Sequence, residues 1–422
     1  MATTKSMSNF PLLCIAQIIS ELSEDSNDLY SCLLVNRMWC KCAVKYLWQM
    51  PFSWCEDNGG RMLTSFLQLL PSESLDDLEY IMGMDIPPPN LRPMFNYLGF
   101  VRTLNLSHCA IATTSYLDTV NPNNTQNTHV RLLLLRLCRE IVINCPFLNE
   151  IYLDELDFDD IDDSVHRWSA RAWNLFSIKD VGIKFNRLRQ FTFTQAFHPD
   201  ILYTAAEKLT KLEVFEFHCS DYPASDDVVV WCDAISKLIR KQERLRVLFL
   251  SLDFESPQNS WKLIWKAVCT QANTLRRIEI QFAEVNDIFS DLGRCTNLHE
   301  IELHYCTFYP SYYLQLPSAA FSHLHTLKLY LMETNSYGIE TLFRNVKESL
   351  KVLSVEIIGA LFDVETWREC ARKAPNLIDF EVLLNQEESI SLIEIVLPLW
   401  KQLKKLKLDI LPDGDDNGVA SK

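Results

Sequence analysis

The sequence predicts an α/β protein in which an N-terminal three-helix domain precedes a curved repeat solenoid, with parallel strands inside and helices outside. Three observations support this fold class. The pattern apolar-x-x-apolar-x-apolar occurs eleven times after residue 100. From Leu275 the copies follow one another at intervals of 23 to 27 residues, the period of a stacked repeat. The first fifty residues lack this pattern and space their apolar side chains at helical intervals.

Composition limits the classes of function. The chain has 422 residues, of which 48% are hydrophobic, so it can bury a large core. Its formal net charge of −15 argues against a nucleic-acid partner, because phosphate binding needs a basic face. The first nine residues are polar and no window of about twenty apolar residues occurs, so we expect neither a signal peptide nor a membrane-bound protein. Fourteen scattered cysteines without a CxxC pair indicate free thiols, and hence the cytoplasm or nucleus.

Residues 10–48 predict three short helices. The segment FPLLCIAQIISEL places apolar residues at helical spacing, and the polar break SEDSND follows it. A second helix carries Leu29 and Leu33, and a third begins after Asn36 and ends before Pro51. Forty residues cannot bury so much apolar and aromatic surface alone, so we expect a partner to cover part of it.

The order of residues in these helices resembles the F-box. It runs from Phe10-Pro11, where Leu is the usual first residue, through a Leu-Leu-Val-Asn-Arg turn at 33–37 to Trp39 and Leu47-Trp48. The resemblance implies docking on the adaptor subunit of a cullin-RING ubiquitin ligase. It implies adaptor contacts from Phe10, Pro11, Ile15, Ile18, Leu22, Leu29, Leu33, Val35 and Trp39. The alternative is that these helices only cap the domain that follows.

The repeated pattern resembles the leucine-rich repeat. In each copy the fourth and sixth positions point inward from a short strand, and the third, fifth and seventh point outward. Segments such as 260–272, 338–349 and 364–374 are amphipathic and predict helices on the convex side. The polar stretch 113–129 predicts a surface loop.

Together the two parts resemble the F-box/leucine-rich-repeat proteins. We expect an F-box at 8–50, a helical connector ending in a proline-rich segment at 51–99, a solenoid of about eleven repeats at 100–410, and a disordered acidic tail at 411–422. The resemblance implies the substrate-recognition subunit of an SCF-type ubiquitin ligase, with adaptor, cullin and substrate as partners. The alternative is a leucine-rich-repeat interaction scaffold.

No catalytic pattern stands out, so we do not expect an enzyme or a cofactor. The chain lacks GxxxxGK[ST], GxGxxG and GxSxG. The segment HEIELH at 299–304 resembles a zinc-protease motif, but its histidines are five residues apart. On a strand that spacing points them to opposite faces, so we expect no metal site.

The outward strand positions of the regular repeats are our candidates for substrate contact. They are rich in acid and include aromatic or imidazole groups, which favours a neutral or basic protein substrate. The alternative is that these charges have no binding role, because solvent-exposed strand faces are often charged. The candidates are Arg277, Glu300, Glu302, His304, Tyr330, Glu356, Asp379 and Glu381.

Overall fold

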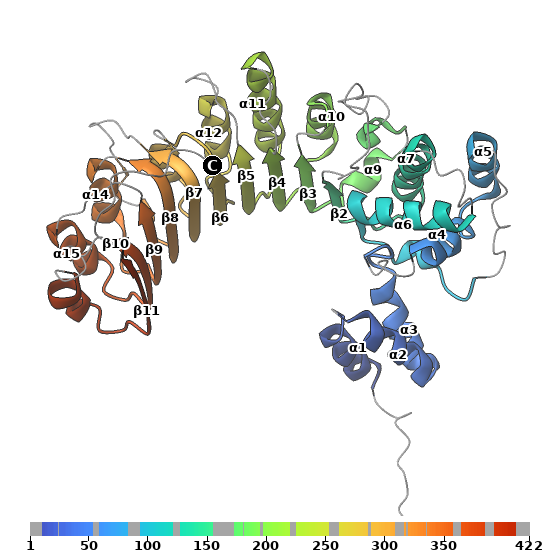
Figure 1. Ribbon diagram of the computed structural model, residues 1–422, viewed down its shortest axis with the longest axis horizontal. Coiled ribbons are helices and arrows are strands. Elements are labelled where there is room, and N and C mark those ends of the chain that lie inside the picture. The colour runs from blue at the N-terminus through green and yellow to red at the C-terminus, as the bar shows by residue number, and fades with distance from the viewer. Residues whose placement is uncertain are drawn as a thin grey trace, which may run out of the picture. The chain divides into compact units, whose positions relative to one another are not determined.

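The computed structural model describes residues 11–23, 25–53, 59–82, 93–120, 127–154, 173–179, 181–194, 197–219, 225–252, 261–285, 288–308, 316–317, 320–334, 336–357, 364–384 and 392–410. Within these residues, eleven strands form one open parallel sheet whose order follows the chain (Figure 1). Each of the eleven pattern copies supplies one strand, so the predicted parallel α/β repeat architecture is confirmed. None of the described helices is long and apolar enough to cross a membrane.

The chain divides into two units, residues 1–201 and 202–422. This division falls inside the repeated region and does not coincide with the boundaries expected near residues 50 and 99. The first unit contains α1 (Leu12–Glu21), α2 (Ser26–Val35), α3 (Arg37–Leu47), α4 (Gly59–Leu67), α5 (Ser72–Met82), β1 (Thr103–Asn105), α6 (Leu106–Val120), α7 (Asn127–Asn144), β2 (Glu150–Leu153), α9 (Gly182–Phe185) and β3 (Gln190–Thr194). Helix α10 (Asp200–Lys208) spans the division.

The three N-terminal helices begin where the sequence provides capping residues. The Asp25 side chain accepts hydrogen bonds from the amides of Asn27 and Asp28 at the start of α2. The Asn36 side chain likewise accepts from the amides of Met38 and Trp39, which separates α2 from α3. Such caps satisfy amides that have no partner inside the helix. The prediction of three helices in this region is confirmed.

Residues 59–82 of the expected connector form helices α4 and α5 of the first unit, and its proline-rich segment lies outside the described residues. Helix α4 packs against α6, and the Gly60 amide donates to the Ser115 hydroxyl at 3.1 Å. A β-carbon on Gly60 would lie 3.0 Å from the Ser115 carbonyl oxygen, so this close approach requires glycine. The predicted loop at 113–129 is wrong for residues 113–120 and 127–129, which are helical. Thr113 and Tyr116 are buried, because the polar stretch still carries one face that packs on the core.

The end of the N-terminal helical unit is hydrogen-bonded to the first strand. The Gln49 carbonyl accepts from the amides of Arg102 and Thr103, at 2.9 and 3.2 Å. The Arg102 carbonyl in turn accepts from Asn149 and Glu150, at 2.7 and 3.1 Å. The Gln49 carbonyl therefore accepts the two amide hydrogen bonds at the start of β1, just as the carbonyl of Arg102 accepts the two at the start of β2.

The second unit contains the regular repeats. Its elements are β4 (Val214–Cys219), α11 (Ser225–Arg240), β5 (Val247–Leu252), α12 (Trp261–Cys269), β6 (Arg277–Gln281), α13 (Ile288–Leu292), β7 (Glu300–Phe308), β8 (Thr326–Thr334), α14 (Ser336–Asn345), β9 (Val352–Ile357), α15 (Val364–Lys373), β10 (Asp379–Leu384), the short helices Leu392–Val396 and Leu397–Leu399, and β11 (Lys405–Ile410). Helices α11, α12, α14 and α15 lie on one side of these strands (Figure 1). We call the opposite side the open face.

The core of this unit lies between the strands and the helices. Leu303, Leu329, Val355 and Val382 are at most 1% exposed, as predicted from the repeat register. Leu303 pairs with Leu329, and Leu329 with Val355, so these side chains form a continuous row. Each fully buried side chain of this size contributes roughly 1.5–3 kcal/mol.

Candidate functional site

An ion-pair network occupies the open face of β6, β7 and β8. The Arg277 guanidinium lies 3.0 Å from Glu279, 3.5 Å from Glu300 and 3.3 Å from Glu302. Lys328 lies 3.3 Å from the other oxygen of Glu302. The strand register produces this convergence, because Arg277 pairs with Glu300, and Glu302 pairs with both Glu279 and Lys328.

Glu302 is the centre of the network. Only 7% of the residue is exposed, and its carboxylate lies 3.5 Å from the His304 imidazole. The adjacent His304 imidazole and the charges of Lys328 and Arg277 outweigh burial and lower the Glu302 pKa to about 2. Glu302 therefore stays ionised and positions its neighbours. Neighbouring side chains cover most of Glu302, so its carboxylate is less accessible than an exposed one, and its contact with a substrate stays a prediction.

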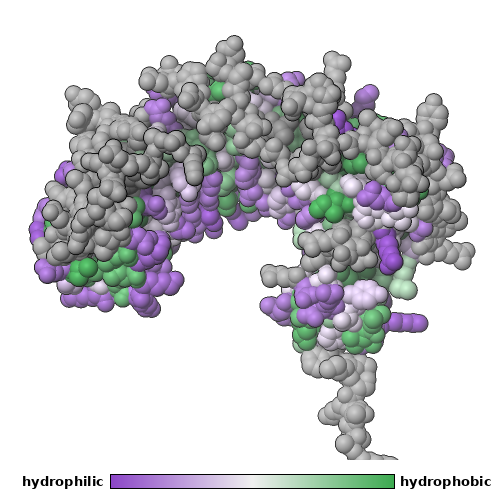
Figure 2. Space-filling view, viewed as in Figure 1, coloured by the Kyte–Doolittle hydropathy of each residue, from purple (hydrophilic) through white to green (hydrophobic). Residues whose placement is uncertain are grey.

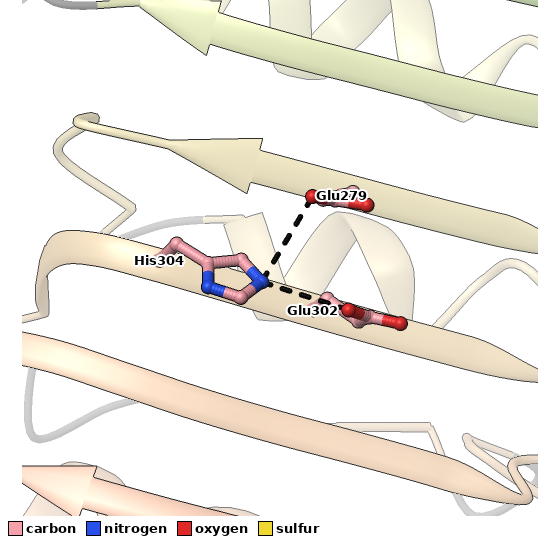
Figure 3. Close-up of side chains that lie close together, drawn as sticks. All are labelled: Glu279, Glu302 and His304. Carbon is pink, nitrogen blue, oxygen red and sulfur yellow. Dashed lines mark ion pairs between the residues drawn. The ribbon is translucent and has the colours of Figure 1, made fainter.

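Three potential metal ligands meet in this network (Figure 3). Ligand atoms of Glu279, Glu302 and His304 lie within 4.8 Å of one another. Both carboxylates are already paired with Arg277, and Glu302 is also paired with Lys328. A divalent cation here would face two fixed positive charges at short range. The arrangement fits an ion-pair network better than a metal site.

The two histidines of HEIELH belong to different surfaces. His304 stacks on Tyr330 across β7 and β8, with ring centroids 4.8 Å apart and planes at 16°. His299 precedes β7 and contacts His323 and His325, at 6.3 and 5.2 Å between centroids. The prediction that the two imidazoles do not converge is confirmed.

Two exposed aromatic residues lie beside this network. The rings of Phe282 and Tyr305 stack with centroids 5.2 Å apart and planes at 11°. Tyr305 is 56% exposed, and Phe282 is 38% exposed. The φ angle is 56° at Phe282 and 54° at Tyr305. This left-handed conformation is uncommon for bulky residues and costs of order 1–3 kcal/mol. Strained, solvent-exposed aromatic pairs of this kind are suited to contact with a partner.

The remaining substrate candidates lie on the same face but differ in availability. Glu381 is paired with Lys407 and accepts from the Ser354 hydroxyl at 3.2 Å. Asp379 lies 3.4 Å from Lys405. Glu356 is exposed and has no ion-pair partner among the described residues. Most of the acid is thus neutralised within the protein, and Glu356 is the acidic candidate most open to a partner.

The N-terminal helical unit separates the adaptor candidates into two groups. Ile15 and Leu29 are at most 1% exposed and form the core of the unit, so they are not accessible on its surface, and their contact with an adaptor stays a prediction. Pro11, Ile18 and Val35 are exposed, whereas Leu22, Leu33 and Trp39 are half-buried. Phe10 lies outside the described residues. The helical period explains the division, because one stripe of each helix must face its neighbours.

Several large apolar side chains of this unit remain on its surface, and Figure 2 shows apolar patches there in green. Leu34 is 75% exposed, and its neighbours Val35 and Met38 are 50% and 37% exposed. These three residues surround the junction of α2 and α3. Among the described residues of α1 to α3, the exposed large apolar side chains are Leu12, Leu13, Ile18, Tyr30, Leu34, Val35 and Met38. Clusters of this kind mark interaction surfaces in soluble proteins.

Comparison with known proteins finds no relative of the chain, since neither a protein-family model nor a curated protein matches it.

Glu279 and Lys328 belong to the network but were not among our predicted site residues. Both occupy outward positions of the repeat, and only the alignment of copies across strands brings them to Glu302. Phe282 and Tyr305 were also missed, because each follows the six-residue pattern.

Proposed function

We propose that the chain is the substrate-recognition subunit of an SCF-type cullin-RING ubiquitin ligase. In this proposal α1 to α3 act as an F-box that docks on the adaptor, and the leucine-rich repeats bind a protein substrate. The observation that carries the proposal is the exposed apolar junction at Leu34, Val35 and Met38. It lies in the part of the sequence that resembles the F-box, on a unit whose internal core is already filled.

The mechanism we propose is positional. An adaptor bound to α1 to α3 and a substrate bound to the repeats would be held in one assembly, which raises the local concentration of substrate lysines near a ubiquitin-loaded enzyme. The chain would supply binding surfaces and no catalytic group. It would raise the rate of ubiquitin transfer by removing the entropic cost of bringing the substrate and the ubiquitin-loaded enzyme together.

The open face of β6 to β8 is our proposed substrate surface. The Phe282–Tyr305 and His304–Tyr330 stacks provide rigid aromatic contact area. Glu356, at a position that pairs with Tyr330, adds a negative charge that no described residue pairs with. This combination favours a neutral or weakly basic segment, held mainly through aromatic contacts.

A second function has its own supporting observation. Because the Gln49 carbonyl accepts the first hydrogen bonds of β1, the N-terminal helices also cap the repeats. Capping units are required to make repeat proteins soluble. In an interaction scaffold, the N-terminal helices would only cap the repeats, and no adaptor would bind at the α2–α3 junction.

Co-purification with adaptor and cullin subunits tests the choice between these functions. We expect the full-length chain to co-purify with both. The double variant Leu34→Glu, Val35→Glu should reduce recovery of the adaptor at least about tenfold, because each buried apolar contact contributes roughly 1.5–3 kcal/mol.

The matched control places the same charges on α11. Val229 and Val230 are also adjacent exposed apolar residues, at 46% and 40%, so Val229→Glu, Val230→Glu should retain the adaptor. Equal recovery with both double variants would contradict adaptor docking at the α2–α3 junction. Failure of the unmodified chain to bind adaptor would favour the scaffold.

A further inference from the structure

A row of basic side chains follows the edge of the second unit at which the strands start. The residue just before each of five successive strands, β5 to β9, is basic or a histidine. These residues, which we call the basic ridge, are Arg246, Arg276, His299, His325 and Lys351. They precede the open-face positions and are not part of the ion-pair network described above.

Backbone hydrogen bonds hold the ridge in line. The Arg246 carbonyl accepts from the amides of Arg276 and Arg277, at 2.7 and 3.0 Å. The carbonyls of Arg276, His299 and His325 each accept two amides from the start of the next strand in the same way. Adjacent ridge residues are therefore separated by one strand spacing, about 4.8 Å. In Figure 1 the arrows of β5 to β8 start at their lower ends, and the surface there is hydrophilic, purple in Figure 2.

A cavity of about 390 Å³ lies at one end of the ridge. Three arginines, one histidine and three polar side chains line it, and none of these lining residues is acidic. They are Arg244, Arg246, Asn273, Thr274, Arg276, Asn297 and His299. Guanidinium and amide groups donate hydrogen bonds, so the cavity is suited to an anion.

The charge of the ridge is only partly neutralised. Arg246 lies 3.3 Å from Glu213. Arg244, Arg276 and Lys351 have no ion-pair partner among the described residues. Burial and the positive charges of His299, Lys351 and His323 lower the pKa of His325, although Glu300 acts in the opposite direction. The ridge is thus locally positive on a chain whose net charge is −15.

We propose that the basic ridge binds an acidic, carboxylate-rich segment of a partner protein in an extended conformation. The fixed charges of the ridge extend from Arg246 and Arg276 to Lys351, which lies three strand spacings, about 14 Å, from Arg276, and the two imidazoles between them offer ring N–H donors. An extended acidic segment can follow groups spread over this distance, whereas one compact anion cannot. Arg244 and Arg276, which have no ion-pair partner among the described residues, can each hold a carboxylate through two parallel hydrogen bonds. This surface differs from the open face, so the proposal does not depend on adaptor or substrate binding there.

Fluorescence anisotropy with the full-length chain and a fluorescein-labelled octaglutamate peptide tests the proposal. We expect saturable binding that weakens as sodium chloride is raised, since exposed charges are screened. The double variant Arg244→Glu, Arg276→Glu should weaken binding at least about tenfold, because two charge-assisted contacts are lost and replaced by repulsion. The control variant Lys262→Glu, Lys266→Glu makes the same change in net charge on the exposed face of α12 and should bind within about twofold of the unmodified chain.

Two further probes separate the acidic segment from other anions. A phosphoserine-containing peptide of equal net charge and an oligouridylate of equal charge are measured in parallel, and thermal unfolding verifies that each variant is folded. The proposal predicts that octaglutamate binds at least as tightly as either probe. It is overturned if octaglutamate fails to bind, if the Arg244→Glu, Arg276→Glu variant binds like the control, or if the phosphopeptide or the RNA binds about tenfold more tightly.

Discussion

The carboxylate of Glu302 lies 3.3 Å from the guanidinium of Arg277 on the neighbouring strand, and the residue is almost completely buried. A buried carboxylate is costly unless cations and donors surround it. Glu302 has Arg277 on one side and Lys328 on the other, with His304 beside it. Glu302, on β7, is thus paired with Arg277 on β6 and Lys328 on β8, and these ion pairs connect three successive strands on their open face.

This relationship predicts a pH-dependent contribution to stability. The folded-state pKa of Glu302 is lowered from 4.5 to about 2, so its stabilisation is complete above pH 4.5 and is lost as the pH falls towards 2. Such a shift corresponds to roughly 3 kcal/mol. Urea unfolding of Glu302→Gln should give a lower free energy of unfolding at pH 6, and the difference from the unmodified chain should narrow by pH 3. A constant difference across this range would contradict the role of the ionised carboxylate.

The strand register predicts opposite results at two adjacent positions. Leu329 is fully buried, so Leu329→Asp should lower the free energy of unfolding by several kcal/mol. Tyr330 lies on the open face against His304, so Tyr330→Asp should cost less than about 1.5 kcal/mol. Urea unfolding of both variants measures the difference. Equal losses would show that the alternation is displaced by one residue.

The left-handed backbone at Tyr305 predicts an unusual benefit from glycine. Tyr305→Ala and Tyr305→Gly both remove the stack on Phe282, and they differ chiefly in the cost of a φ near 54°. That cost is roughly 1–2 kcal/mol for a residue with a β-carbon. Thermal unfolding should therefore show the glycine variant to be the more stable of the two. The reverse order would argue against this backbone conformation.

Close packing at Gly60 predicts that alanine is harmful in one helix and harmless in another. In Gly60→Ala the new methyl group would meet backbone atoms of Ser115 and Tyr116 at 3.0 to 3.1 Å. Overpacking costs roughly 1–3 kcal/mol, more than the gain of about 1 kcal/mol in helix propensity. Gly182, also helical, has no atom within 4 Å of the same position, so Gly182→Ala should be neutral or stabilising. Thermal denaturation of the two variants gives the comparison, and a stabilised Gly60→Ala would refute the contact.

The repeated strands were predictable because local pattern and tertiary contact agree there. Each copy alternates apolar and polar residues, and burial follows that alternation through Ile301, Leu303 and their partners. The helices at 260–272, 338–349 and 364–374 were predictable for the same reason. Their apolar stripes face the strands, and the helices form with small changes of boundary.

The site was less predictable because it depends on irregularities. A register shift between His304 and Cys306 inserts Tyr305 into β7 without a partner and turns its ring to solvent. Simple alternation would have placed that ring in the core. The basic ridge, by contrast, was visible in the sequence. Its residues occupy the second position of successive pattern copies. The fold prediction depends only on the apolar positions of each copy, so it does not use them.

The hydrogen bonds from Gln49 to β1 also bear on how molecules of this protein can associate. Open-ended fibres formed by edge-to-edge strand pairing need two accessible edges on every subunit. Strand β1 has only three residues, and its first amide is already bonded to Gln49. At the other end of the sheet, β11 pairs with β10 and with no other described strand. Any association through β11 would join two molecules and stop, so the N-terminal helices act as a terminator of strand polymerisation.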